Sequence, residues 1–99
     1  MGTLRAAVVG LGRMGGHHAR IYASTEGVRL VALVDKRPEN ARQIAALYGG
    51  EIYDRVEDLP GKVDVATIAV PTVQHLAVAA PLIEAGIPVL IEKPLAADV

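Results

Sequence analysis

Short apolar runs alternate with stretches of helical periodicity along the whole of this chain of 99 residues. The helical stretches carry apolar residues every three or four positions, whereas the apolar runs are too short to be helices. Strands that alternate with helices run parallel, because each helix returns the chain to the starting edge of the sheet. The pattern therefore predicts an α/β fold with a doubly wound parallel sheet. We expect strand order 3-2-1-4-5, which places the first strand–helix turn where the order reverses.

The element boundaries follow from residues that start or stop helices and strands. Pro38 suits a first helical turn, Gly49-Gly50 and Gly86 suit helix ends, and Pro81 predicts a kink inside the last helix. The predicted strands are residues 4–10, 29–35, 51–53, 64–70 and 88–92. The predicted helices are residues 13–24, 38–48 and 73–85, with a short helical turn over 56–59.

Each of the first two helices has a predicted inward face, formed by apolar residues at helical spacing. On the first helix this face comprises Met14, His18, Ile21 and Tyr22. On the second it comprises Ala41, Ile44, Ala45 and Tyr48.

The composition suits such a sheet and excludes several functions. Aromatic residues are three Tyr, so Val, Ile, Leu and Ala have to build the core. A net charge of −1 gives no electrostatic reason to expect nucleic acid as a partner. The chain has no cysteine, which excludes disulfides and thiolate chemistry. It shows neither a signal-peptide pattern nor an apolar run of ~18 residues, so we expect a cytoplasmic protein without membrane contact.

A glycine pattern joins the first predicted strand to the first predicted helix. Gly10, Gly12 and Gly15 form GxGxxG in the sequence GLGRMG. In this context Gly10 permits a tight turn, Gly12 lets the backbone approach a pyrophosphate, and Gly15 lets helix and strand pack closely. The free amides of Arg13 and Met14 then face the anion at the favourable end of the helix dipole. The loop predicts a Rossmann-type fold that binds a dinucleotide.

An acidic residue at the end of the second predicted strand indicates which dinucleotide is bound. Asp35 follows Gly15 at the spacing, about 20 residues, at which an acid accepts hydrogen bonds from ribose hydroxyls. A carboxylate repels a 2′-phosphate, so NAD is favoured over NADP. Lys36 and Arg37 follow directly, and two interpretations stay open: a solvated charged turn, or groups that reach a 2′-phosphate.

Two neighbouring histidines, His17 and His18, do not predict a metal site. Adjacent helical positions point about 100° apart, and no third ligand lies near in sequence. His18 lies on the apolar stripe, which favours a packed, hydrogen-bonded histidine.

Two later segments fall at the carboxyl ends of the fourth and fifth predicted strands, where an open α/β sheet binds its ligand. They are VPTVQH at 70–75 and EKP at 92–94. Lys93 places a cation at the expected nicotinamide end of the site. A lysine there can hydrogen-bond a substrate oxygen, stabilise negative charge or transfer a proton.

Taken together, these motifs resemble the Gfo/Idh/MocA family of glucose–fructose oxidoreductases and inositol dehydrogenases. The resemblance rests on GLGRMG at 10–15, His18, Asp35, VPTVQH at 70–75 and EKPLA at 92–96. It implies an NAD(P)-dependent oxidoreductase that acts on CH–OH groups of a sugar, inositol or related polyol.

The same resemblance implies roles for residues of the last two motifs. Lys93 would be the catalytic or substrate-orienting lysine, and the bond that corresponds to Lys93–Pro94 is often cis in relatives. Glu92 would lie near the nicotinamide riboside, and Pro71, Thr72 and His75 would line the cofactor cleft. For His75, helix capping or packing is an equally good interpretation.

Relatives of this family continue into a further α+β domain, which supplies much of the substrate pocket and the subunit interface. We therefore expect residues 1–99 to be an incomplete dinucleotide-binding domain, truncated after the fifth strand and inactive alone. The whole protein is expected to be a homo-oligomer. Two other functions stay open: a non-catalytic dinucleotide-binding or redox-sensing module, and a methyltransferase that uses S-adenosylmethionine.

Overall fold

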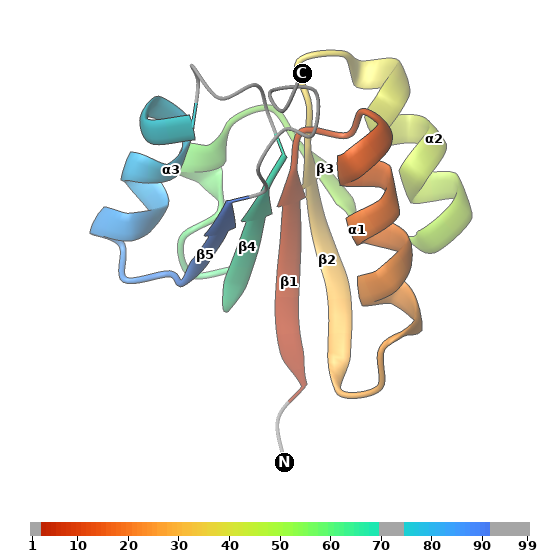
Figure 1. Cartoon of the computed structure of the whole chain (residues 1–99), viewed down its shortest axis with the longest axis horizontal. Coiled ribbons are helices and arrows are strands. Elements are labelled where there is room, and N and C mark those ends of the chain that lie inside the picture. Colours follow the sequence, from red (N-terminus) through yellow and green to blue (C-terminus); the bar gives the residue numbers. More distant parts are fainter. Residues whose placement is uncertain (1–2, 70–74, 92–99) are drawn as a thin grey trace, which may run out of the picture.

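The computed structural model contains one parallel sheet of five strands with helices on both faces (Figure 1). It describes residues 3–69 and 75–91, without the side chains of Arg13, Met14, His75 and Leu76. The strands are β1 (Leu4–Val9), β2 (Val28–Val34), β3 (Glu51–Tyr53), β4 (Val65–Ile68) and β5 (Val89–Ile91). The helices are α1 (Arg13–Ser24), α2 (Pro38–Tyr48), the 3₁₀ turn η1 (Val56–Asp58) and α3 (His75–Glu84).

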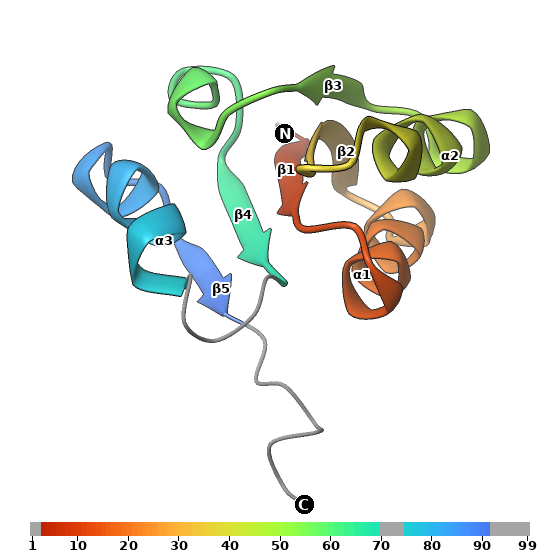
Figure 2. The same cartoon turned by 90° about the horizontal axis from the view of Figure 1, so that it is seen from above.

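The sheet has the order β3-β2-β1-β4-β5 with every pairing parallel, so the predicted topology is confirmed. Helices α1 and α2 lie on one face of the sheet, and α3 and η1 lie on the other (Figure 2). Strands β1, β2 and β4 end one or two residues earlier than predicted, whereas β3 has the predicted bounds. Gly10 and Asp35 thus lie in the connections beyond β1 and β2, at the edge where a ligand has access.

The core is divided by the sheet into two clusters of buried apolar residues. Under α3 and η1, Leu59, Ile68 and Leu82 are fully buried. Under α1 and α2, Val8 and Leu33 are fully buried. The predicted inward face of α2 is confirmed, because Ala41 is buried and Ile44, Ala45 and Tyr48 pack against the second cluster.

The inward face of α1 differs from the prediction. Ala19 is fully buried, Gly15 is buried and Tyr22 packs on the core, whereas Ile21 is 40% exposed. The face is thus rotated by about one residue from the expected stripe. Its small residues bring the helix axis close to the sheet, and a larger side chain at those positions would hold the two apart.

A pair of hydroxyl groups connects α1 to β4 inside this packing. Thr67 is a buried polar residue of β4, and its hydroxyl shares a hydrogen bond with the Tyr22 phenol. An unpartnered hydroxyl at such a site would cost about 1–3 kcal/mol. The contact fixes the position of α1 across the sheet.

The amino ends of β1 and β4 are joined by an ion pair at the surface. Arg5 Nη2 lies 3.0 Å from Asp64 Oδ1, and Arg5 Nε donates to Asp64 Oδ2 at 3.2 Å. Hydrogen bonds from the Arg5 side chain and backbone lower the pKa of Asp64 below its usual value of 3.8. Ionised Asp64 therefore stabilises the fold above its unfolded-state pKa, and this contribution disappears as the pH falls through the lowered pKa.

An Asp64→Asn variant is accordingly expected to melt below the wild type at neutral pH. The gap between the two should close in acid, below the pKa of Asp64. Thermal unfolding followed by circular dichroism across pH checks this, with Asp54→Asn as a control that leaves the Arg5–Asp64 contact intact. A gap that stays constant down to strong acid would show that the ion pair is not its cause.

Within the described residues, no helix is long and apolar enough to cross a bilayer. In the same parts of the chain, no three His, Asp or Glu side chains gather as a metal site would require. The rings of His17 and His18 lie edge to face with centroids 6.4 Å apart, and His18 is half-buried.

Helix α3 continues past Pro81 to Glu84, so this proline lies inside the helix, as the sequence predicts.

Candidate functional site

The connection between β1 and α1 turns sharply at Gly10. Its φ of 90° lies in the left-handed region that favours glycine, as the predicted tight turn requires. The Gly10 amide donates to the Val34 carbonyl at 2.7 Å, which ties the turn to the end of β2. The loop is therefore held between two strands at the carboxyl edge of the sheet.

Gly15 permits the close approach of α1 to this turn. A Cβ placed there would lie 1.6 Å from the Gly10 carbonyl oxygen and 2.7 Å from its carbon. These are backbone atoms, so no side chain can rotate away to make room. The predicted packing role of the third glycine is confirmed.

The space in front of Gly12 is open. A Cβ there would have no atom within 4 Å, and Gly12 caps α1 without a side-chain hydrogen bond. The first turn of α1 contains no acidic residue. The amides of Arg13 and Met14 lie in this first turn, where helical N–H groups lack partners within the helix. Unoccupied space beside uncapped amides is the geometry that a pyrophosphate requires.

The Asp35 carboxylate faces the glycine loop. Its Oδ2 accepts a hydrogen bond from the Leu11 amide at 2.5 Å, and its Oδ1 accepts one from the Arg37 amide at 2.7 Å. Two backbone donors therefore fix the direction of this half-buried side chain. Each carboxylate oxygen has room for a further donor, so Asp35 can still receive the hydroxyls of a ribose.

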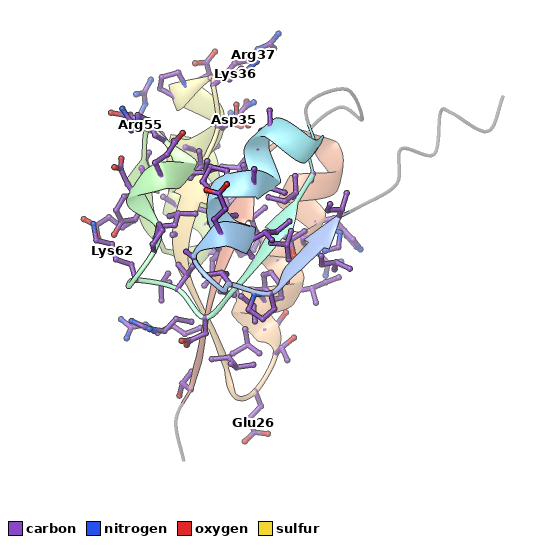
Figure 3. The ribbon with its side chains drawn as sticks, turned by 90° about the vertical axis from the view of Figure 1, so that its left-hand side faces the viewer. Glu26, Asp35, Lys36, Arg37, Arg55 and Lys62 are labelled. Atoms are coloured by element: carbon purple, nitrogen blue, oxygen red, sulfur yellow. The ribbon has the colours of Figure 1, made fainter. Side chains whose placement is uncertain are left out.

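One cavity of about 540 Å³ connects the loop to Asp35 and to the segment after β3. Gly10, Leu11 and Gly12 border it on one side, and Val56 and Val78 supply apolar wall. Figure 3 shows Asp35, Lys36, Arg37 and Arg55 at the same end of the molecule, opposite to Glu26. The cavity is large enough for the adenosine half of a dinucleotide, with apolar surface for a base and polar groups for a sugar.

A second cavity of about 650 Å³ lies at the opposite, amino-terminal edge of the strands. Arg5, Arg29, Gly50 and Lys62 are among its lining residues. Although it is larger, it contains neither the glycine loop nor Asp35. In an open parallel sheet ligands bind at the carboxyl edge, so the smaller cavity is the candidate site.

The cavity thus brings Gly10, Gly12, Asp35 and Lys36 together. Pro71, Thr72, Glu92 and Lys93 lie outside the described residues, and so does the Lys93–Pro94 bond. His75 starts α3 at the same edge of the sheet, and its side chain is not described.

Several residues of the cavity were missed by the sequence reading. They are Asn40, Asp54, Arg55, Val56, Glu57 and Val78. Those at 54–57 follow β3, a strand of only three residues, whose carboxyl end lies beside that of β2. The available signal was the rule that every strand of such a sheet ends at the ligand edge.

The fold and this site define the protein as a dinucleotide-binding domain of the Rossmann type. The chain belongs to the Gfo/Idh/MocA family, whose model, an oxidoreductase family with an NAD-binding Rossmann fold, matches residues 4–99. The resemblance in the sequence is confirmed, and with it NAD as the cofactor of the family.

Relatives and solved structures agree with this assignment. Inositol 2-dehydrogenase of Corynebacterium glutamicum (strain R) is 41% identical over 97% of this chain. UDP-N-acetylglucosamine 3-dehydrogenase of Acidithiobacillus ferrooxidans is 36% identical over 96% of it. The structure of GenD2 from gentamicin A biosynthesis, in complex with NAD, superposes with a TM-score of 0.88 at 33% identity, covering 96% of this chain and 28% of that one. The chain spans about 30% of the length of the two curated relatives.

Proposed function

We propose that the whole protein is an NAD-dependent dehydrogenase of a cyclic polyol or sugar, and that residues 1–99 contribute its cofactor site. The observation that carries the proposal is the Asp35 carboxylate held beside the uncapped start of α1 within one cavity. The relatives named above are dehydrogenases of an inositol and of a nucleotide-linked amino sugar. A substrate hydroxyl on a six-membered ring is the feature that these names share.

Different residues of the site are proposed to bind different parts of NAD. The amides of Arg13 and Met14 would hold the pyrophosphate, with Gly12 leaving the space for it. Asp35 would accept hydrogen bonds from the adenosine ribose. Pro71, Thr72, His75 and Glu92 are proposed to line the remainder of the cofactor cleft. When bound, NAD supplies the acceptor for the hydride.

Lys93 is proposed to hydrogen-bond the substrate hydroxyl oxygen and to stabilise negative charge that develops on it. A further domain would complete the substrate pocket and the subunit interface of a homo-oligomer. We also propose a cytoplasmic location, which the absence of cysteine fits.

Turnover by the intact protein tests the proposal. With NAD and a panel of inositols and sugars, we expect NADH formation at 340 nm with at least one substrate. Lys93→Ala should lower kcat about 10²–10⁴-fold while NADH still binds with nearly unchanged affinity. Unchanged turnover in the Lys93→Ala protein would contradict the role proposed for Lys93. The absence of turnover with every polyol would favour a non-catalytic dinucleotide module instead.

A further inference from the structure

Three cationic side chains border the cavity beside Asp35. Lys36 and Arg37 extend from the connection after β2, and Arg55 extends from the connection after β3. The parallel register pairs Val34 with Tyr53, so Asp35 and Arg55 follow strand ends that lie side by side. Figure 3 shows the four residues at one end of the molecule. Arg55 is outside both the glycine loop and the acidic position that follows β2.

Within the described residues, no ion pair joins the Asp35 carboxylate to these cations. Its two oxygens accept hydrogen bonds from backbone amides, those of Leu11 and Arg37. The carboxylate thus has a fixed direction toward the loop, while the cationic groups of Lys36 and Arg37 are exposed. The edge of the ribose site therefore has positive charge next to the carboxylate that repels a phosphate.

Arg55 has a weak partner in Glu57. Its Nε lies 3.6 Å from Glu57 Oε1, and the two side chains are 67% and 52% exposed. An ion pair this exposed to solvent contributes little to stability. A phosphate offers a guanidinium two parallel charge-assisted hydrogen bonds and competes well against such a pair.

We propose that Arg55 is a specificity-determining residue for position 2′ of the adenosine ribose, and that Glu57 restrains it. This inference rests on the proposed dinucleotide site. Arg55, with Lys36 and Arg37, lets the site accept the 2′-phosphorylated dinucleotide as well as NAD, against the repulsion by Asp35. Glu57 competes for the guanidinium and thereby keeps the preference on the side of NAD.

Dissociation constants of NADH and NADPH, measured on the intact protein by nucleotide fluorescence at fixed ionic strength, test the inference. Arg55→Gln should weaken NADPH binding about tenfold, as expected for the loss of a charge-assisted contact. The same variant should change the dissociation constant of NADH less than about twofold. Glu57→Gln should have the opposite effect and tighten NADPH binding about threefold. Arg55→Lys, which keeps the charge but not the planar fork, should fall between wild type and Arg55→Gln.

Arg29→Gln is the matched control, because it makes the same charge change at the opposite edge of the sheet. It should leave the ratio of the two dissociation constants unchanged. Two results would overturn the role of Arg55 but not the cofactor site. They are an unchanged ratio of the two dissociation constants in Arg55→Gln, or undetectable NADPH binding by both wild type and Glu57→Gln. If neither dinucleotide binds the folded wild type, the cofactor site itself fails, and this inference with it. Circular dichroism confirms folding of each variant, whose changed side chain is at the surface.

Discussion

Gly15→Ala is expected to destabilise the protein by about 3 kcal/mol or more, the upper range for overpacked cores. The added methyl would lie 1.6 Å from the Gly10 carbonyl oxygen, so either α1 or the turn at Gly10 has to move. Both are fixed, α1 by its packing on the sheet and the turn by the bond from Gly10 to Val34. Urea unfolding of the intact protein measures the loss.

Gly12→Ala is the control, because the same methyl group meets no atom within 4 Å there. Its expected cost to stability is below about 1 kcal/mol, as for a change at a helix cap. The methyl occupies the space proposed for the pyrophosphate, so NADH should bind at least about tenfold more weakly. Gly15→Ala should thus lower the stability of the fold, whereas Gly12→Ala should mainly weaken NADH binding. A Gly15→Ala protein as stable as Gly12→Ala would contradict the observed packing of the turn.

Asp35→Ala is expected to weaken NADH binding about a hundredfold. The substitution removes the acceptor proposed for the ribose hydroxyls, and charge-assisted hydrogen bonds of this kind are worth about 1.5–3 kcal/mol each. It also leaves the Leu11 amide without its partner, so the glycine loop loses a support before any ligand arrives. Isothermal titration of wild type and variant with NADH measures the change.

Asp54→Ala supplies the comparison for this result. It removes the same charge from the same cavity, at the end of the neighbouring strand. If Asp35 contacts the ribose directly, Asp54→Ala should bind NADH within a few-fold of the wild type. Equal losses in the two variants would contradict a ribose contact that is specific to Asp35.

The sequence was sufficient to predict the sheet order, because strand–helix alternation leaves few arrangements of a parallel sheet. The roles of Gly10 and Gly15 were also predictable, since each follows from local backbone geometry. The inward face of α1 was not, as Ile21 shows. Periodicity counts apolar residues, whereas the closeness of a helix to its sheet is set by small ones such as Gly15 and Ala19.

The residues that border the cavity after β3 could also not be predicted from the sequence. Arg55 and Glu57 follow a strand of three residues, and their place beside Asp35 depends on the register between β2 and β3. Such long-range registers are not local properties of the chain. The lysine of the EKP motif, Lys93, stays a prediction.

The amide groups of the glycine loop and the Asp35 carboxylate are proposed to hold the dinucleotide at the carboxyl edge of the sheet. Titration of ¹⁵N-labelled protein with NAD, followed by amide chemical shifts, tests this binding mode residue by residue. We predict saturable shifts that are largest for the amides of Leu11, Gly12 and Arg13, and for those just after β2. Shifts concentrated around Gly50 and Lys62, at the amino-edge cavity, or no saturable shifts in a folded protein, would contradict it.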